Sequence, residues 1–197
     1  MASNFGKTIQ VATFGASHGY AIGGIVEGLP CGHTIDIDEL QAFLKRRAPG
    51  QNQLQTQRKE ADIPEFLSGM VDGMLSGSPL AFMIRNTSQH SGDYNNLRDI
   101  PRPSHADFTA RMRYGDKVDM RGGGHFSARL TAPLCVAGGI ALQLLREKGI
   151  EIHGHLKQVG TIQDAPIDMV HPDMKALASI ATEPIAMVDP QKRNEVE

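Results

Sequence analysis

The sequence predicts an α+β fold that mixes antiparallel strands with helices. Strand-like segments occur in pairs, and helical segments lie between the pairs. Strands and helices do not alternate regularly, as they would in a fold with a parallel sheet. The chain has 197 residues, of which 40% are hydrophobic and 21% are charged. These proportions are ordinary for a folded globular domain and argue against disorder.

The first expected elements are two strands, at residues 8–14 and 22–28, joined by a glycine-flanked turn that holds Ser17 and His18. A helix is expected after Asp36, because apolar residues then recur at helical spacing and either Asp36 or Asp38 can cap the first turn. The segment "RRAPG" ends this helix, since proline and glycine stop helices. The serine and histidine are therefore expected at the end of a strand.

A β-hairpin with a longer loop is expected from residues 66–71 and 79–85. The stretch at 85–104 is too rich in Asn, Asp, Ser and Pro for regular structure, and so long a loop is functional or mobile. Ser104 is expected to cap the next helix, with Asp107 as its partner three residues on.

The stretch from Arg121 reads as a glycine loop followed by a long apolar helix that ends at Gly149. Pro133 would either kink this helix or mark its true start. A helix so apolar on all sides is expected at the centre of the fold. After it, residues 150–160 alternate like a strand and residues 172–181 suggest a short helix, whereas the charged tail predicts no element.

Net charge and apolar segments indicate whether the protein binds nucleic acid, enters a membrane or is secreted. The formal net charge of −2 gives no general attraction to nucleic acid. The N-terminus lacks the apolar segment of a secretory signal, and Gln143 interrupts the longest apolar run before it could span a bilayer. We therefore expect a cytoplasmic protein that binds neither nucleic acid nor membrane.

No metal site is expected. Cys31 and Cys135 lie far apart and outside any zinc-binding spacing, so reduced thiols are the simpler interpretation. His153 and His155 would share one face of a strand, but no third ligand lies at a suitable spacing.

An anion site is the main chemical hypothesis. The segment "RGGGHFSAR" runs from a glycine loop into a helix, whose free N–H groups attract anions, and Arg121 and Arg129 would add bidentate donors. A flexible connector with incidental charge is the alternative. Further arginines stand in segments punctuated by glycine or proline, and several converging on one cleft would imply a multiply anionic ligand: Arg46, Arg47, Arg102, Arg111 and Arg113.

Two histidines are candidate acids or bases. His18 and His105 both follow a serine at a junction between a loop and a regular element, where an imidazole can reach a ligand. Each could equally be a structural histidine. Ser17 is poorly placed to act as a nucleophile with its own neighbour as base, and "GASHG" is not the GxSxG elbow of serine hydrolases.

Several segments together resemble the chorismate synthase family. "FGASHG" resembles its FGESHG signature, "KRRAPGQ" its RRRPGQ segment, "RPSHADFT" its RPGHADYT segment and "RGGGHFSAR" its RGGGRSSAR segment. The hairpin "LSGMVDGMLSGSPLAFMIRN" also resembles a family segment. The matches occur in the family's order over nearly the whole chain.

The resemblance implies a carbon–oxygen lyase of the shikimate pathway, which serves aromatic amino acid biosynthesis. It would remove phosphate and a proton from 5-enolpyruvylshikimate 3-phosphate to give chorismate, and it would require reduced FMN. The implied fold is a β-α-β sandwich, and the implied assembly is a homotetramer. Residues 1–197 would form a single domain that corresponds to the family's N-terminal portion.

The resemblance also assigns roles to residues. His18, with Ser17 beside it, would protonate the departing phosphate, and His105 would protonate or stabilise the reduced flavin. The other implied contacts are to substrate, from Arg47, Arg102 and Arg129, and to FMN, from His105, His125, Phe126 and Ser127.

The chain departs from the family pattern in two ways. Ala16 replaces the signature glutamate, and Ser104 replaces a glycine before the histidine, whereas His125 and Phe126 are a variant found within the family. Family members also continue well beyond this length and carry much of the FMN site in the further part. A non-catalytic remnant that keeps an anion-binding or oligomerisation surface is therefore the alternative function.

Overall fold

The computed structural model describes residues 3–48, 61–87 and 100–196, which divide into two compact units. The larger unit contains the described residues up to Leu144, and the smaller unit runs from Leu145 onward. Most of the polar stretch expected as a loop, residues 88–99, lies outside the described part. The expectation of a single domain stays a prediction.

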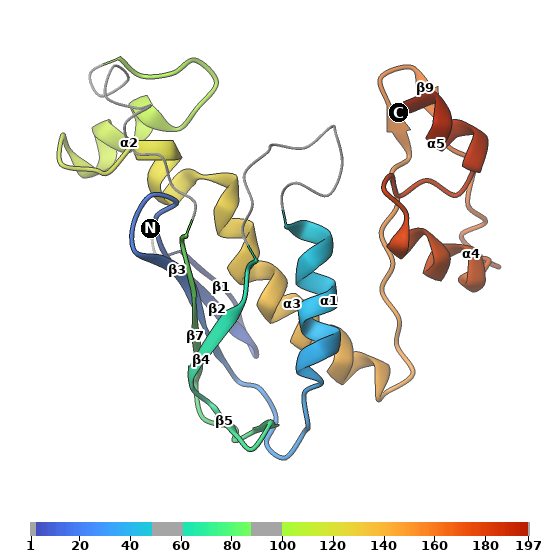
Figure 1. Ribbon diagram of the computed structural model, residues 1–197, viewed down its shortest axis with the longest axis horizontal. Helices are drawn as coiled ribbons and strands as arrows, with labels where there is room; N and C mark the ends of the chain where they lie inside the picture. The colour runs from blue at the N-terminus through green and yellow to red at the C-terminus, as the bar shows by residue number, and fades with distance from the viewer. Residues whose placement is uncertain (1–2, 49–60, 88–99, 197) are drawn as a thin grey trace. The chain divides into compact units, whose positions relative to one another are not determined.

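The larger unit is built on a five-stranded antiparallel sheet with strand order β1-β2-β3-β7-β4 (Figure 1). The two strands expected around the Ser-His turn are confirmed as a directly paired β2 and β3. In chain order the strands are β1 Asn4–Gly6, β2 Gln10–Gly15, β3 Ala21–Glu27, β4 Pro64–Ser68 and β7 Leu80–Arg85.

One face of this sheet packs against two helices, α1 (Ile37–Arg47) and α3 (Thr131–Arg146). Val11 pairs with Val26 across the strands, so both side chains lie on the same face, and both belong to the core. Burying one such aliphatic side chain contributes about 1.5–3 kcal/mol. The helices supply Leu40 and Leu44 from α1, and Val136, Ile140 and Leu144 from α3.

The start of α1 is fixed as the sequence predicts. The Asp36 carboxylate accepts the Glu39 backbone N–H at 2.9 Å, which is a typical N-cap. Gln143 of α3, which interrupts the apolar run, is buried and exchanges two hydrogen bonds with the Asp36 backbone, at 2.8 and 2.9 Å. The one polar residue on the buried side of α3 thereby ties the two helices together.

The apolar helix starts next to Pro133, which is one of the two possibilities that its sequence leaves open. α3 begins at Thr131, so Pro133 lies in the first turn, where its missing N–H is tolerated, and it marks the start rather than a kink. Among the described residues, the stretch Arg121–Arg146 is long and apolar enough to cross a membrane by length and composition, and 44% of its apolar 18-residue window is buried. By this measure, and contrary to the expectation from the sequence, Gln143 does not shorten the apolar run below the length of a span. Packing of its buried face into the core accounts for that apolar character.

The expected cap on the next helix is wrong. α2 spans Asp107–Tyr114, its N-cap is Ala106, and no side chain caps it. Ser104 instead adopts a positive φ of 58°. Asp107 does not serve the cap, because its carboxylate is taken up by Arg102.

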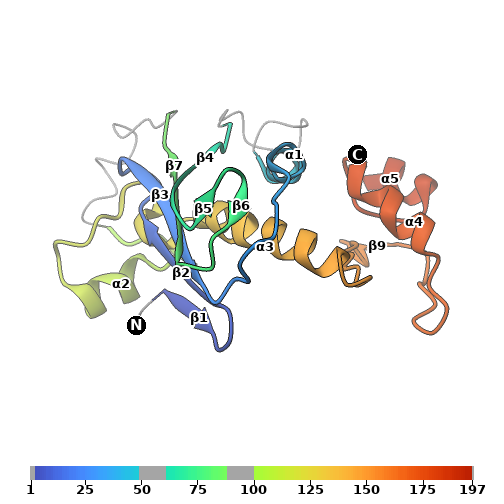
Figure 2. The same ribbon diagram turned by 90° about the horizontal axis from the view of Figure 1, so that it is seen from below.

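The expected hairpin forms between β4 and β7, but its first strand is shorter than predicted. The register shifts after Phe66, and the following residues form a separate small hairpin of β5 (Met70–Val71) and β6 (Met74–Leu75) (Figure 2). Its two-residue turn is Asp-Gly, the pair favoured in tight hairpins.

The smaller unit corrects two expectations. Residues 150–157 lie in no strand, and only β8 (Gln158–Val159) pairs with β9 (Ile162–Gln163), because alternation alone provides no partner strand. The expected short helix is confirmed as α4 (Met174–Ser179). The charged tail, which predicted no element, forms α5 (Pro190–Val196).

A buried carboxylate organises the smaller unit. The Asp164 oxygens accept backbone N–H groups of Ala165, Val188 and Asp189 at 2.7–2.9 Å. Burial alone raises the pKa of Asp164, but these hydrogen bonds together bring it below its usual range. The carboxylate thereby joins segments 24 and 25 residues apart, and the buried apolar residues of the described part of this unit are Ile180, Ile185 and Met187.

Candidate functional site

The Ser-His turn between β2 and β3 is anchored to the glycine loop rather than open to solvent. Ser17 is fully buried and His18 is 8% exposed. The Ser17 backbone N–H donates to the Gly124 carbonyl at 3.1 Å, and the Ser17 hydroxyl lies 3.2 Å from the Gly122 carbonyl. That hydroxyl is also 3.2 Å from His18 Nδ1. Ser17 thus ties the histidine to a segment more than a hundred residues away.

The glycine loop contacts both candidate histidines. Gly122 and Gly123 have φ values of 59° and 97°, in the left-handed region that side chains disfavour. A Cβ on Gly122 would lie 2.0 Å from His18 Nδ1, and one on Gly123 would lie 3.1 Å from His105 Nε2. The fold therefore brings His18 and His105 to neighbouring positions of one loop.

The loop does not lead directly into an α-helix, as the anion hypothesis assumed. Short 3-10 turns within Arg121–Phe126 and Ala128–Leu130 precede α3, and the non-helical backbone of the three glycines at 122–124 interrupts the first segment. Arg121 is not turned to a ligand either, because its guanidinium binds both carboxylate oxygens of Asp119, at 2.9 and 2.8 Å. The anion interpretation therefore cannot rest on the N-terminus of α3.

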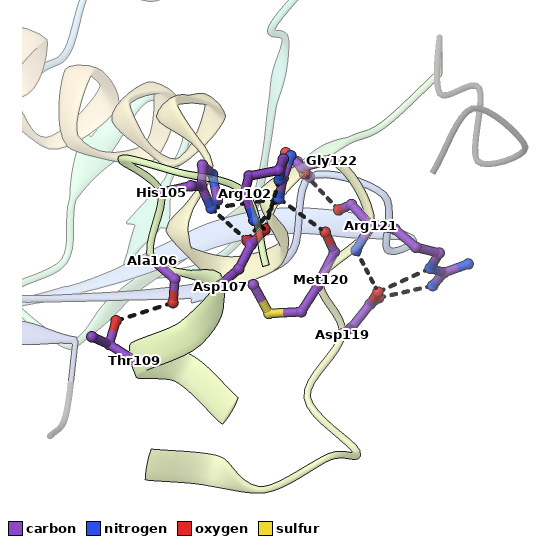
Figure 3. A network of polar contacts seen from close by, with 10 residues as sticks. Arg102, His105, Ala106, Asp107, Thr109, Asp119, Met120, Arg121 and Gly122 are labelled. Carbon is purple, nitrogen blue, oxygen red and sulfur yellow. Dashed lines mark hydrogen bonds and ion pairs between the residues drawn. The ribbon is translucent and has the colours of Figure 1, made fainter. Parts of the chain in front are cut away.

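One carboxylate joins two of the predicted site residues (Figure 3). Arg102 donates from Nε to one oxygen of Asp107 at 2.7 Å and from Nη2 to the other at 2.8 Å. His105 Nδ1 lies 2.5 Å from the second oxygen. Hydrogen bonds from Arg102 hold the pKa of Asp107 far below its usual range. The sequence reasoning missed this role, although the acid stands within the "RPSHAD" motif.

A second carboxylate joins two of the three predicted substrate arginines. Asp62 lies 2.5 Å from Arg47 Nη1 and 2.7 Å from Arg129 Nη1, through different oxygens. The Asp62 side chain is fully buried, and that of Arg129 is 5% exposed. The expected convergence therefore occurs for Arg47 and Arg129, whereas Arg102 is bound to another carboxylate. No sequence signal marked Asp62.

Asn86 connects this arginine pair to the Ser-His turn. Its side-chain oxygen accepts from Arg129 Nε at 2.9 Å, and its amide donates to the carbonyls of Ala16 and Gly19 at 3.0 and 2.8 Å. The turn and the arginines are thus held in one hydrogen-bonded unit. Two of the other candidate cations lie over aromatic rings instead, Arg46 over Phe43 and Arg113 over Tyr114.

Two of the residues expected to contact a flavin, His125 and Phe126, line an open groove of about 640 Å³, whereas His105 and Ser127 are not among the described residues that line it. Phe126 is 39% exposed there. His125 Nδ1 donates to the Gly15 carbonyl at 2.9 Å, and its Nε2 contacts the Ser3 hydroxyl. Ser127 accepts the Arg129 backbone N–H at 3.3 Å and so caps the turn before α3. Further lining comes from α2, including Phe108, Met112, Arg113 and Tyr114.

In the part of the chain that the structure describes, no three His, Cys, Asp or Glu side chains gather as a metal site. The prediction that His153 and His155 share a strand face is wrong, because neither lies in a strand. His153 contacts Glu151 at 2.9 Å, and His155 lies 3.8 Å from Asp164. Cys31 and Cys135 are free.

Comparison with known proteins identifies a single family. The family model described as chorismate synthase matches residues 9–197. A protein named chorismate synthase from Lancefieldella parvula is 47% identical over 86% of this chain, and one from Bacteroides thetaiotaomicron is 48% identical over 83%. In both cases the match covers 45% of the relative, so the chain spans about half the length of these relatives.

A solved structure shares the fold. "Crystal Structure of Chorismate Synthase" aligns with a TM-score of 0.67 at 24% sequence identity, and the alignment covers 96% of this chain and 51% of that one. The predicted fold, an N-terminal portion of that architecture with mixed helices and strands, is thereby confirmed.

Proposed function

Because the chain belongs to the chorismate synthase family, we propose that it carries the N-terminal part of a lyase active site. The reaction would eliminate phosphate and a proton from 5-enolpyruvylshikimate 3-phosphate to give chorismate. The observation that carries this proposal is the placement of His18 and His105 against neighbouring glycines of one loop. An acid for the leaving group and a second proton-carrying ring could then act on one bound ligand.

His18 is the proposed acid for the departing phosphate. Its imidazole suits proton transfer near neutral pH, and the Ser17 contact limits the orientation of the ring. Burial to 8% exposure restricts competing water around the ring. In this role His18 donates a proton to a phosphate oxygen as the carbon–oxygen bond breaks.

Arg47 and Arg129 are the proposed anchors for the substrate's anionic groups. Asp62 offsets one of their two charges, so the trio keeps one net positive charge beside the Ser-His turn. Guanidinium groups bind phosphate and carboxylate through charge-assisted hydrogen bonds. The Arg102 guanidinium donates two hydrogen bonds to the Asp107 carboxylate, which makes Arg102 a weaker candidate for direct substrate contact.

The groove beside Phe126 has the chemistry expected for a flavin. Its walls carry exposed aromatic and apolar side chains for a planar ring, and Arg113 adds a cation. Phe126 and His125 would border the ring, with His105 lying against the adjacent glycine loop. Reduced FMN, when bound, would supply electron density to a reaction whose substrate and product have the same oxidation level.

A second candidate is a non-catalytic remnant that keeps an anion-binding or oligomerisation surface. The observation in its favour is the arginine pair, because Arg47 and Arg129 with Asp62 keep a net positive charge without any further residue. Cytoplasmic location and a homotetrameric assembly are expectations from the family under either proposal.

A complementation experiment separates the two candidates. The 197-residue chain would be mixed with the C-terminal remainder of the Lancefieldella parvula relative, and chorismate formation and FMN fluorescence would be followed. The lyase proposal expects chorismate only from the mixture, and weak or no FMN binding by the chain alone. Binding of the two pieces without chorismate would favour the remnant.

His18→Ala in the active mixture would lower turnover by about 10² to 10⁴-fold, the usual loss for a general acid. His153→Ala is the matched control, because that histidine lies in the smaller unit and contacts Glu151. Normal turnover by folded His18→Ala would show that the leaving group is protonated by another residue.

A further inference from the structure

Resting on the proposed function, we propose that Asp107 is a positioning residue that holds His105 and Arg102 in one geometry against the glycine loop. His105 Nδ1 is then bound to a carboxylate, and Nε2 is the nitrogen that exchanges a proton with a ligand. Arg102 acts through Asp107, because its guanidinium binds the Asp107 carboxylate and not the substrate.

The contacts around Asp107 satisfy both of its oxygens. One oxygen accepts the Arg102 backbone N–H at 3.0 Å and Nε at 2.7 Å, and the other accepts Nη2 at 2.8 Å. The second oxygen also lies 2.5 Å from His105 Nδ1. The Asp107 side chain is 4% exposed, whereas those of Arg102 and His105 are 24% and 28% exposed. The carboxylate is thus the buried centre of the cluster.

The chemistry of these groups fixes where the proton lies. An ionised carboxylate only accepts hydrogen bonds, so His105 Nδ1 must carry the hydrogen at this contact. Arg102 Nη2, which is also a donor, lies 3.4 Å from that nitrogen, and this longer contact is weaker than the one at 2.5 Å to the carboxylate. The carboxylate therefore selects the Nδ1–H tautomer through its own contact to the ring.

The remaining nitrogen lies beside the loop. Nε2 is 3.1 Å from the position of a Cβ on Gly123, so a side chain at this position would have to displace the ring by a few tenths of an ångström. In the Nδ1–H tautomer, Nε2 carries the lone pair when the ring is neutral and a proton when it is charged. Both states can serve a ligand at the glycine loop.

Nitrogen-15 NMR of histidine-labelled chain tests the tautomer directly and needs no cofactor. The His105 ring signals are assigned by their loss in His105→Gln, and all spectra are taken at one mildly alkaline pH. We expect an Nδ1–H correlation in the wild-type chain. Asp107→Asn should lose it, because a single amide oxygen cannot serve both the Arg102 fork and the imidazole.

Asp119→Asn is the matched control. Asp119 forms the same two-oxygen pair with Arg121, at 2.9 and 2.8 Å, but makes no hydrogen bond to the His105 ring. It should leave the His105 signals unchanged. A folded Asp107→Asn chain that keeps the wild-type Nδ1–H signal would overturn the proposal.

Arg102→Gln keeps the test decisive if Asp107→Asn does not fold. This change removes the fork and leaves the Asp107 contact to His105, so the Nδ1–H signal should persist. Its loss would show that Arg102, and not Asp107, orients the ring. The tautomer does not depend on turnover, so a failure of chorismate formation would count against the proposed function alone.

Discussion

Two carboxylates each hold a pair of cationic or titratable site residues, but they do so over very different distances along the chain. Asp107 binds Arg102, five residues before it, and His105, two residues before it. Asp62 binds Arg47, 15 residues away, and Arg129, 67 residues away. The first cluster is a local motif, whereas the second exists only when the sheet and both helices are assembled.

The two clusters also differ in burial. Both carboxylates are buried, with Asp62 and Asp107 side chains 0% and 4% exposed, and the clusters differ in their basic partners. The Arg129 side chain is only 5% exposed, whereas those of Arg47, Arg102 and His105 are 21–28% exposed. A charge left without its partner costs more where water cannot reach it. Loss of the aspartate–arginine ion pair should therefore lower the free energy of unfolding more at Asp62 than at Asp107, where it should mainly affect the local arrangement of side chains.

The largest expected effect is on stability. Asp62→Ala leaves a buried guanidinium without its carboxylate and should lower the free energy of unfolding by about 3–5 kcal/mol. Asp107→Ala, at the more exposed pair, should cost about 1–3 kcal/mol. Urea unfolding followed by circular dichroism measures both. Equal losses would remove the distinction between the two clusters.

Gly122→Ala should lower the free energy of unfolding less than Asp62→Ala does, but it should lower turnover more strongly than it lowers stability. The new Cβ would fall 2.0 Å from the His18 ring, so the ring must move. Gly149→Ala is the matched control, because its φ is also positive, at 70°, and nothing lies within 4 Å of its Cβ position. Both should lose about 1 kcal/mol to backbone strain.

The two glycine variants should differ in function. In the complemented assembly, Gly122→Ala should approach the His18→Ala turnover, whereas Gly149→Ala should stay near the wild-type rate. Similar turnover in both variants would mean that the position of His18 is not critical.

The smallest effect is the pH dependence of the local cluster. Arg102 lowers the pKa of Asp107 in the folded chain, so the unfolded chain takes up a proton first, near the ordinary aspartate value of about 3.9. The stabilisation is complete above that pH and is lost as the pH falls toward the folded value. Urea unfolding between about pH 6 and pH 3 should show a smaller decrease for Asp107→Asn than for the wild type. Parallel curves would contradict the assignment.

Local chemistry allowed much of the fold to be predicted from the sequence. The strands β2 and β3, the Asp36 cap of α1 and the helix α4 follow from periodicity and capping within a few residues. The family motifs marked His18 and His105, because each lies within a short signature. These features depend on neighbours along the chain, which a sequence displays directly.

Tertiary structure decided which groups meet. The alternating residues 150–160 had no partner strand with which to form a sheet, so most of them lie outside any strand. The helix after Ser104 forms, but without the expected side-chain cap, because the Asp107 carboxylate binds Arg102 instead. Asp62 carried no signal, since its partners come from two helical segments far from it in sequence. The energy of a buried ion pair depends on desolvation and on distances that packing determines. Neither quantity can be obtained from the amino-acid sequence alone.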